Sequence, residues 1–176
     1  MGKVTGNIEV RKLHQCNVYL DTVGYVGLAS EVQLPAFKAV TKEHSPTSMY
    51  GKVDIPLGLD KMTLTITGDF DEDFVAAASD FYQTRIIELR SALTTYDDMG
   101  RGITRSVKAT MRVLFQGYEP TAFKNGEVAE LKYTAGCLTY KLEIEGVVIH
   151  DVNALGNVHD VLDVNLNTKT NDVLGL

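Results

Sequence analysis

Strict alternation of apolar and polar residues predicts several β-strands. The clearest case is a run in which Met62, Leu64 and Ile66 alternate with three threonines. Because successive side chains of a strand point to opposite faces, this strand has one apolar face and one threonine face. The segments 86–96 and 103–116 alternate in the same way around a charged, glycine-containing turn, and together they predict a long hairpin.

The apolar positions shift by one residue within the segment 129–144. They are odd-numbered in its first half and even-numbered in its second half. A single extra residue near Gly136, a β-bulge, keeps both sets on one face of one long strand. The pair Glu145-Gly146 then predicts a tight turn into a further strand at 147–152.

Two more segments predict extended structure. The run 25–34 alternates well enough to be a strand, and 8–20 fits a short extended lead-in that is broken near His14-Gln15. The tail after residue 153 is polar with scattered valine and leucine, and it predicts no element. The pattern therefore indicates about eight strands.

Helical spacing of apolar residues occurs in one segment, at about 71–83. Asp71 is a suitable N-cap, and the acidic residues in the first turn complement the helix dipole. We expect one short helix that packs on the sheet through an aromatic and alanine stripe, formed by Phe74, Ala77, Ala78 and Phe81.

The segment from about 36 to 60, here called the arm, is predicted to be two extended stretches around an irregular tip. Pro46 and Pro56 cannot donate hydrogen bonds to a strand ladder. Met49 and Tyr50 place two large apolar side chains at the tip, where a small domain normally has polar ones. We expect such a tip to dock on something other than its own core.

Composition narrows the class of protein. The chain has 176 residues, which indicates a single domain spanning 1–176. With 17 basic and 23 acidic residues its net charge is -6, which argues against a surface built to grip nucleic acid. The first residues lack the apolar run of a signal peptide. Cys16 and Cys137 are expected to be reduced, buried thiols.

No segment predicts catalysis, a metal ion or a cofactor. Asp69, Asp71 and Asp73 have the alternate spacing of a calcium loop, but Phe74 stands where that loop needs glycine. The four histidines lack zinc spacing, and no Gly-x-Ser-x-Gly motif occurs. Four basic residues leave two interpretations open, a solvated or salt-bridged face and a contact with a passing polyanion: Arg101, Arg105, Lys108 and Arg112.

Several short motifs follow one another in a specific order. They are Arg11-Lys12-Leu13, the runs 31–35, 49–61, 68–71 and 140–146, and a closing Leu174-Gly175-Leu176. In this order and spacing the chain resembles the major tail tube proteins of contractile-tailed bacteriophages, a family that includes the tube proteins of R-type pyocins. The chain departs from that pattern in Pro46-Thr47-Ser48, where family members often have small residues or paired glycines.

The resemblance implies a mainly β fold, an antiparallel β-sandwich or barrel-like subunit with one flanking helix that contributes strands to an oligomeric tube barrel. It implies six subunits per ring, with rings stacked inside a contractile sheath. The implied partners are the sheath protein, baseplate and tail-terminator proteins, and the tape measure protein and DNA inside the lumen, bound without sequence specificity. The implied location is the tail of the virion, after assembly in the cytoplasm of the host bacterium.

Two sets of residues follow as candidates for these contacts. We expect the arm to form the subunit or ring interface through His44, Pro46, Met49, Tyr50 and Lys52. A neutral or acidic lumen lets DNA slide, so we expect polar strand residues to face it: Thr63, Thr65, Thr67 and Glu88. The alternatives are a monomeric β-barrel that binds a small ligand, and the tube of a pyocin-like or type VI particle.

Overall fold

The computed structural model describes residues 10–44, 51–96, 101–120 and 129–174, and it is mainly antiparallel β. Two of the elements are helices, α1 (Glu72–Ser79) and α2 (Thr168–Leu174). The strands of the described residues are β1 (Val10–Leu20), β2 (Val23–Tyr25), β3 (Ala29–Gln33), β4 (Ala39–His44), β5 (Val53–Leu59), β6 (Thr63–Asp69), β7 (Arg85–Tyr96), β8 (Gly102–Pro120), β9 (Glu130–Ile144), β10 (Val147–Asn153), β11 (Val158–Val161) and β12 (Val164–Asn165).

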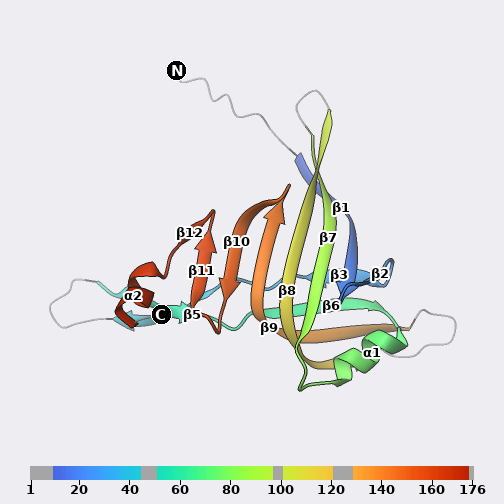
Figure 1. The fold of residues 1–176 in the computed structure, drawn as a ribbon, viewed down its shortest axis with the longest axis horizontal. Helices are drawn as coiled ribbons and strands as arrows, with labels where there is room; N and C mark the ends of the chain where they lie inside the picture. Colours follow the sequence, from blue (N-terminus) through green and yellow to red (C-terminus); the bar gives the residue numbers. More distant parts are fainter. Residues whose placement is uncertain (1–9, 45–50, 97–100, 121–128, 175–176) are drawn as a thin grey trace.

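One large sheet contains all strands except the arm hairpin. Its order is β12-β11-β10-β9-β8-β7-β1-β2, and β6 joins it by pairing with β3 on one side and β9 on the other. The predicted hairpin of β7 and β8 is confirmed. Figure 1 shows β7 and β8 standing upright while β6 runs across their lower ends, so the sheet bends strongly.

Two bulges account for this bend. In β9, Cys137 and Thr139 face neighbouring residues of β8, which leaves Leu138 as an extra residue. The predicted bulge is therefore confirmed, at Leu138 rather than at Gly136. A second register shift leaves Gln116 unpaired in β8. Because a bulge bends the strand that carries it, the first half of β9 turns toward β6 while its second half pairs with β10.

Other predicted boundaries differ from the structure. The break expected near His14-Gln15 is a register shift inside β1, with Gln15 at a φ of 50°. The strand expected at 25–34 is wrong in its first part, because β2 ends at Tyr25 and a turn with Gly27 at a φ of 83° precedes β3. β8 continues to Pro120 instead of ending at Gly117. The tail contains β11, β12 and α2, which the sequence pattern did not predict.

The core lies inside the bend, between β6 and the β7–β8–β9 sheet. Met62, Leu64 and Ile66 are buried, which confirms the apolar face of that strand. Side chains from neighbouring strands complete the cluster: Val18, Ile87, Met111, Val113, Phe115, Leu131, Tyr133 and Tyr140.

Helix α1 closes the core from one side (Figure 1). Asp71 is its N-cap, as expected, and its carboxylate accepts a hydrogen bond from the backbone N–H of Phe74 at 2.9 Å. The fully buried Phe74 ring packs edge to face against Phe115 and Tyr133, with centroid distances of 6.0 and 4.7 Å. The helix ends at Ser79, so the expectation that Phe81 joins the packing face is wrong: it lies outside the helix and is 48% exposed.

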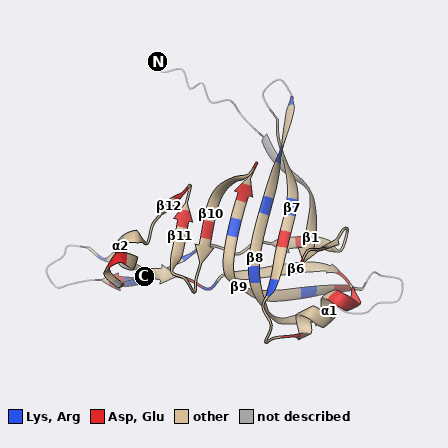
Figure 2. Cartoon of the chain, in the orientation of Figure 1, with Lys and Arg blue, Asp and Glu red and all other residues tan. Residues whose placement is uncertain are grey.

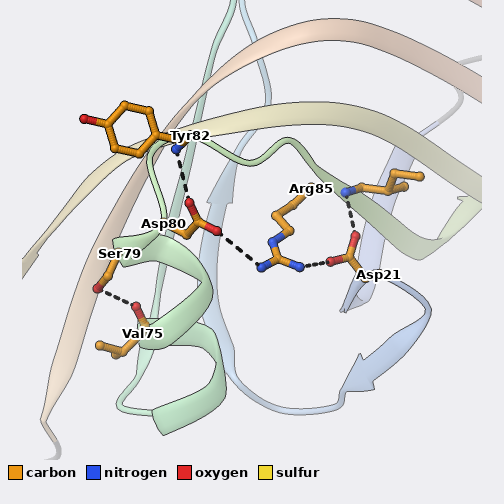
Figure 3. A network of polar contacts seen from close by, with 7 residues as sticks. Asp21, Val75, Ser79, Asp80, Tyr82 and Arg85 are labelled. Carbon is orange, nitrogen blue, oxygen red and sulfur yellow. Dashed lines mark hydrogen bonds and ion pairs between the residues drawn. The ribbon is translucent and has the colours of Figure 1, made fainter.

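A polar network ties the end of α1 to the β1–β2 turn (Figure 3). The guanidinium of Arg85 lies 3.1 Å from a carboxylate oxygen of Asp21 and 3.8 Å from one of Asp80. The other Asp21 oxygen accepts a hydrogen bond from the backbone N–H of Ile86 at 2.9 Å. Asp80 also accepts from the backbone N–H of Tyr82 at 3.2 Å. These contacts hold the chain where it leaves the helix and enters β7.

Both cysteines are free thiols. Cys137 is buried as expected, and this burial raises the pKa of its thiol to about 12. Cys16 is exposed, so the expectation that it is buried is wrong. Within the described ranges, neither helix has the length and apolarity to cross a membrane.

Phe74→Ala should lower the free energy of unfolding of the unassembled subunit by about 3 to 5 kcal/mol, because it leaves a cavity where three aromatic rings meet. Urea denaturation followed by circular dichroism measures this change. Tyr82→Ala is the matched control, since that ring is 97% exposed and its loss should change stability by less than about 0.5 kcal/mol. Equal losses in both variants would contradict the role given to Phe74.

Candidate assembly surfaces

The arm forms a hairpin that is separate from the large sheet. β4 and β5 pair only with each other among the described strands. All residues of β4 are exposed, and those of β5 are exposed except Leu59. An isolated two-stranded hairpin is at best marginally stable in water. A partner surface that covers one face would therefore stabilise it.

The two faces of this hairpin differ in character. Lys42 pairs with Ile55 and His44 pairs with Val53 on one face, while Glu43 pairs with Asp54 on the other. The register shift beside Val40 and Thr41 leaves Leu57 as an extra residue. The first face carries exposed apolar side chains, which define the apolar arm face: Val40, Val53, Ile55 and Leu57.

The opposite face of the hairpin is polar and internally paired. Lys52 and Glu43 form a salt bridge of 2.7 Å between largely exposed side chains. Thr41 pairs with Pro56 on this face, where the missing proline N–H costs little because the hairpin has no third described strand. The hairpin is therefore amphipathic, with its apolar side uncovered in the single chain.

The base of the arm is fixed to the large sheet. The Phe37 ring packs in T-shaped contacts on Tyr140 and His150, with centroid distances of 4.9 and 4.2 Å. The backbone N–H of Asp60 donates to the carbonyl of Lys38 at 2.7 Å and closes the base. From this anchor the hairpin reaches the end of the molecule opposite α1 (Figure 1).

The structure places only part of the predicted arm interface. His44 and Lys52 are exposed at the outer end of the hairpin. Pro46, Met49 and Tyr50 lie outside the described residues, so their docking stays a prediction. The apolar arm face was not among the predicted sites, although the alternation of Val53, Ile55 and Leu57 along the sequence indicates it.

The second candidate surface is the side of β7, β8 and β9 that faces away from the core. Glu88 lies at its centre and contacts both Arg90 of its own strand and Lys108 of β8, the latter at 3.1 Å. Burial acts to raise the pKa of Glu88, but the hydrogen bonds and charges of Arg90 and Lys108 outweigh it and hold the pKa below its usual range. The ionised form of Glu88 is therefore favoured by the two cations, Arg90 and Lys108, that contact its carboxylate.

A further ion pair lies on this surface, where Lys141 and Glu143 of β9 are 2.9 Å apart. Arg105 occupies the alternate set of β8 positions, on the side of Ala109 and Met111, and approaches Glu145 in the turn after β9 at 4.0 Å. Figure 2 shows basic and acidic residues interspersed over β7 to β11. Lys108 and Arg105, two of the four basic residues noted in the sequence, thus form ion pairs within the chain.

The threonines predicted to face a lumen lie elsewhere on the same sheet. Thr63, Thr65 and Thr67 are half-buried on β6, on the side opposite its core residues. β8 and β9 separate β6 from the strand of Glu88. The structure therefore does not bring the three threonines next to Glu88. It also groups no three histidine, cysteine, aspartate or glutamate side chains into a metal site within the described residues.

Comparison with known proteins identifies relatives of this chain. The family model described as Phage tail tube protein FII matches residues 10–175. The tail tube protein of Escherichia phage P2 is 25% identical over 154 residues, covering 86% of this chain and 89% of that protein.

Solved structures show a similar fold at low sequence identity. One is the sheath/tube terminator of an extracellular contractile injection system, with a TM-score of 0.52, 9% identity and coverage of 74% of this chain and 94% of that one. Another comes from the sheath-tube complex of such a system, with a TM-score of 0.51, 11% identity and coverage of 73% and 88%.

Glu88→Gln should lower the free energy of unfolding by about 0.5 to 1 kcal/mol near pH 7, because it removes a carboxylate held by two cations. A carboxylate with a lowered folded-state pKa stabilises the fold above its unfolded value of about 4.3, and this stability is lost as the pH falls through the folded pKa. The difference between the two proteins should therefore vanish in acid. Urea titrations of both proteins, near pH 7 and in acid below the pKa of Glu88, measure this difference in the free energy of unfolding.

Glu145→Gln is the control for this measurement, because the Glu145 side chain is 56% exposed and its ion pair is long. We expect almost no change for it at either pH. A difference for Glu88→Gln that persists unchanged in acid would show that its carboxylate charge is not the cause.

Proposed function

The chain belongs to the Phage tail tube protein FII family, and we propose that it forms stacked six-membered rings that serve as the conduit for genome ejection. The family consists of structural tail tube proteins of contractile tails, so the chain is a component of the virion tail and not an enzyme. The proposal concerns how copies of the chain assemble and what passes through them. In it, residues 1–176 act as one tail tube domain.

The observation that carries this proposal is the uncovered apolar arm face. Four large apolar side chains lie exposed on one side of a two-stranded sheet. Leu57 is the most exposed of the four, at 65%. Burying such side chains stabilises an assembly by about 1.5 to 3 kcal/mol each. We propose that the occupant is a second copy of this chain, in the same ring or the next one. We propose that the predicted tip residues Pro46, Met49 and Tyr50, with His44, extend this interface, and that Lys52 contacts the partner from the polar face, where it pairs with Glu43.

Strand number also supports assembly from several copies. A pore that passes duplex DNA needs a barrel with more strands than the roughly 16 to 18 of a porin. β1 pairs with β2 only at Val18, Tyr19 and Leu20, so its earlier part has one open edge among the described strands. Open edges are sites for pairing with another chain, and a closed ring leaves none. Several chains together can supply the wall that one cannot.

The polar side of the sheet suits the inside of such a wall. We propose that Glu88 on β7 and the threonine positions 63, 65 and 67 on β6 line the lumen. Positive charge at a lumen wall would retain DNA through release of counterions. Here Arg90 and Lys108 are held by Glu88, and the whole chain carries a net charge of -6. DNA and the tape measure protein would then pass without sequence-specific contact.

The proposed external partners are a contractile sheath, a baseplate and a tail terminator, and the proposed site of assembly is the cytoplasm of the host bacterium. The solved relatives from a sheath-tube complex and a tube terminator support the first and last of these. The tube of a pyocin-like or type VI particle remains an alternative that differs in its cargo. Family membership gives no support to a monomeric ligand-binding barrel.

Ile55→Asp should weaken polymer formation while the subunit stays folded, because it places a charge on the apolar arm face. The critical concentration for assembly should rise at least about tenfold, the factor that corresponds to 1.4 kcal/mol. Light scattering and negative-stain microscopy measure assembly, and circular dichroism reports the fold. Deletion of residues 44–52 should have the same effect.

Thr41→Asp is the matched control, since it introduces the same charge on the polar face of the same hairpin. It should assemble like the unmodified chain. Tubes of normal stability from Ile55→Asp or from the deletion would rule out docking through the arm.

A cryo-EM structure of the polymer should show six chains around a lumen with a neutral or negative potential. The wall should contain the polar sides of β6 and β7. A strongly positive lumen, or a wall formed by the arm, would contradict the proposed arrangement.

A further inference from the structure

Two histidines lie under the base of the arm, and we propose that they form a pH-sensitive latch whose double protonation releases Phe37 and loosens the arm. His150 belongs to β10 and His159 to the neighbouring β11, and their Nε2 atoms are 3.2 Å apart. The inference rests on the proposed function of the arm as an assembly element, and it adds a condition under which that element is held.

The short distance between the two Nε2 atoms requires that only one of them carries a proton. At 3.2 Å one Nε2 donates a hydrogen bond and the other accepts it, which is possible only while at least one ring is neutral. If both rings are protonated, both nitrogens are donors and two like charges face each other at contact distance. The Nδ1 atom of His150 is also buried without a hydrogen-bond partner. A proton on that atom would be a buried donor without an acceptor, which is costly.

The groups around the pair do not compensate for this charge. Burial and the neighbouring His159 lower the pKa of His150, and Asp151 opposes them only in part. Asp151 pairs with Asp160 on the other face of the two strands, and Tyr140 of β9 lies beside His150 as a neutral ring. A histidine with a lowered folded-state pKa stabilises the fold above its unfolded pKa of about 6.5, and this stability is lost as the pH falls below it.

The pair is connected directly to the arm. The Phe37 ring lies 4.2 Å from the His150 ring in a T-shaped contact, and it also packs on Tyr140. Phe37 packs the base of the arm on these two rings, and 39% of it remains exposed. If the charged rings separate, the surface under Phe37 changes. The hairpin that projects from this base then loses its fixed direction.

The chain contains no tryptophan, so Phe37→Trp provides a single fluorescent reporter at the latch. Indole emission moves to longer wavelength when the ring leaves a packed contact for water. We expect the emission maximum to move to longer wavelength as the pH is lowered from about 8 to about 5, with a midpoint below the ordinary histidine value of about 6.5. Light scattering of the polymer formed by the natural chain should fall over the same range.

His159→Gln tests the pair itself, because glutamine can keep the hydrogen bond but adds no second charge. The midpoint of the wavelength shift and the midpoint of polymer loss should both move to a pH lower by about half a unit or more, because the second charge that separates the rings is missing. His14→Gln on β1 is the matched control, since three strands separate β1 from β10. It should shift neither midpoint.

Unchanged midpoints in His159→Gln would overturn the latch, as would polymer that stays intact through the wavelength shift. Failure of the natural chain to polymerise at about pH 8 would instead contradict the proposed function. In that case the fluorescence titration still tests the histidine pair in the single chain.

Discussion

The pairing of β8 with β9 determines where the other elements lie. Both strands change direction at bulges, Gln116 in β8 and Leu138 in β9, and the apolar side chains of both halves remain on the same side. The sheet therefore folds around one core instead of forming an open layer, and β6 can close it by pairing with the first half of β9. Helix α1 needs to insert only Phe74 and Ala78 to complete that core.

The same arrangement determines where the arm can go. β3 and β6 are adjacent antiparallel strands, so the arm that connects them leaves the sheet and returns to it at neighbouring points. The core is already filled by the strands that flank it, and only Leu59, the last residue of the hairpin, packs against it. Phe37 anchors the base on β9 and β10, and the apolar arm face stays uncovered in the single chain.

Alternation along the sequence predicted those parts of the fold in which one face of a strand meets the core. It predicted the β7–β8 hairpin and the phase change in β9 because burial forces a period of two. It could not predict β11, β12 or α2, which are short and lack fully buried residues among those described. The prediction for Phe81 was wrong because the helix ends before it. At that point the Asp80 carboxylate accepts a hydrogen bond from the backbone N–H of Tyr82, and the spacing of apolar residues does not reveal such a local contact. The contact between His150 and His159 depends on the register in which β10 pairs with β11. The spacing of the histidines along the sequence does not reveal that register.

The two candidate assembly surfaces differ in how their exposed groups are paired, and the proposed conduit would need this difference. The polar side of the sheet pairs Glu88 with Arg90 and Lys108, and Lys141 with Glu143, which would leave little attraction for a passing polyanion. The apolar arm face is uncovered in the single chain, which would suit the proposed docking of another copy. The titratable groups differ in the same way. Burial acts to raise the pKa of Glu88, but Arg90 and Lys108 hold it below its usual range and favour the ionised carboxylate, whereas burial and His159 lower the pKa of His150 and favour the neutral imidazole. In the proposed assembly, acid would therefore act on the base of the arm through His150, while the ion pairs of Glu88 resist protonation of its carboxylate.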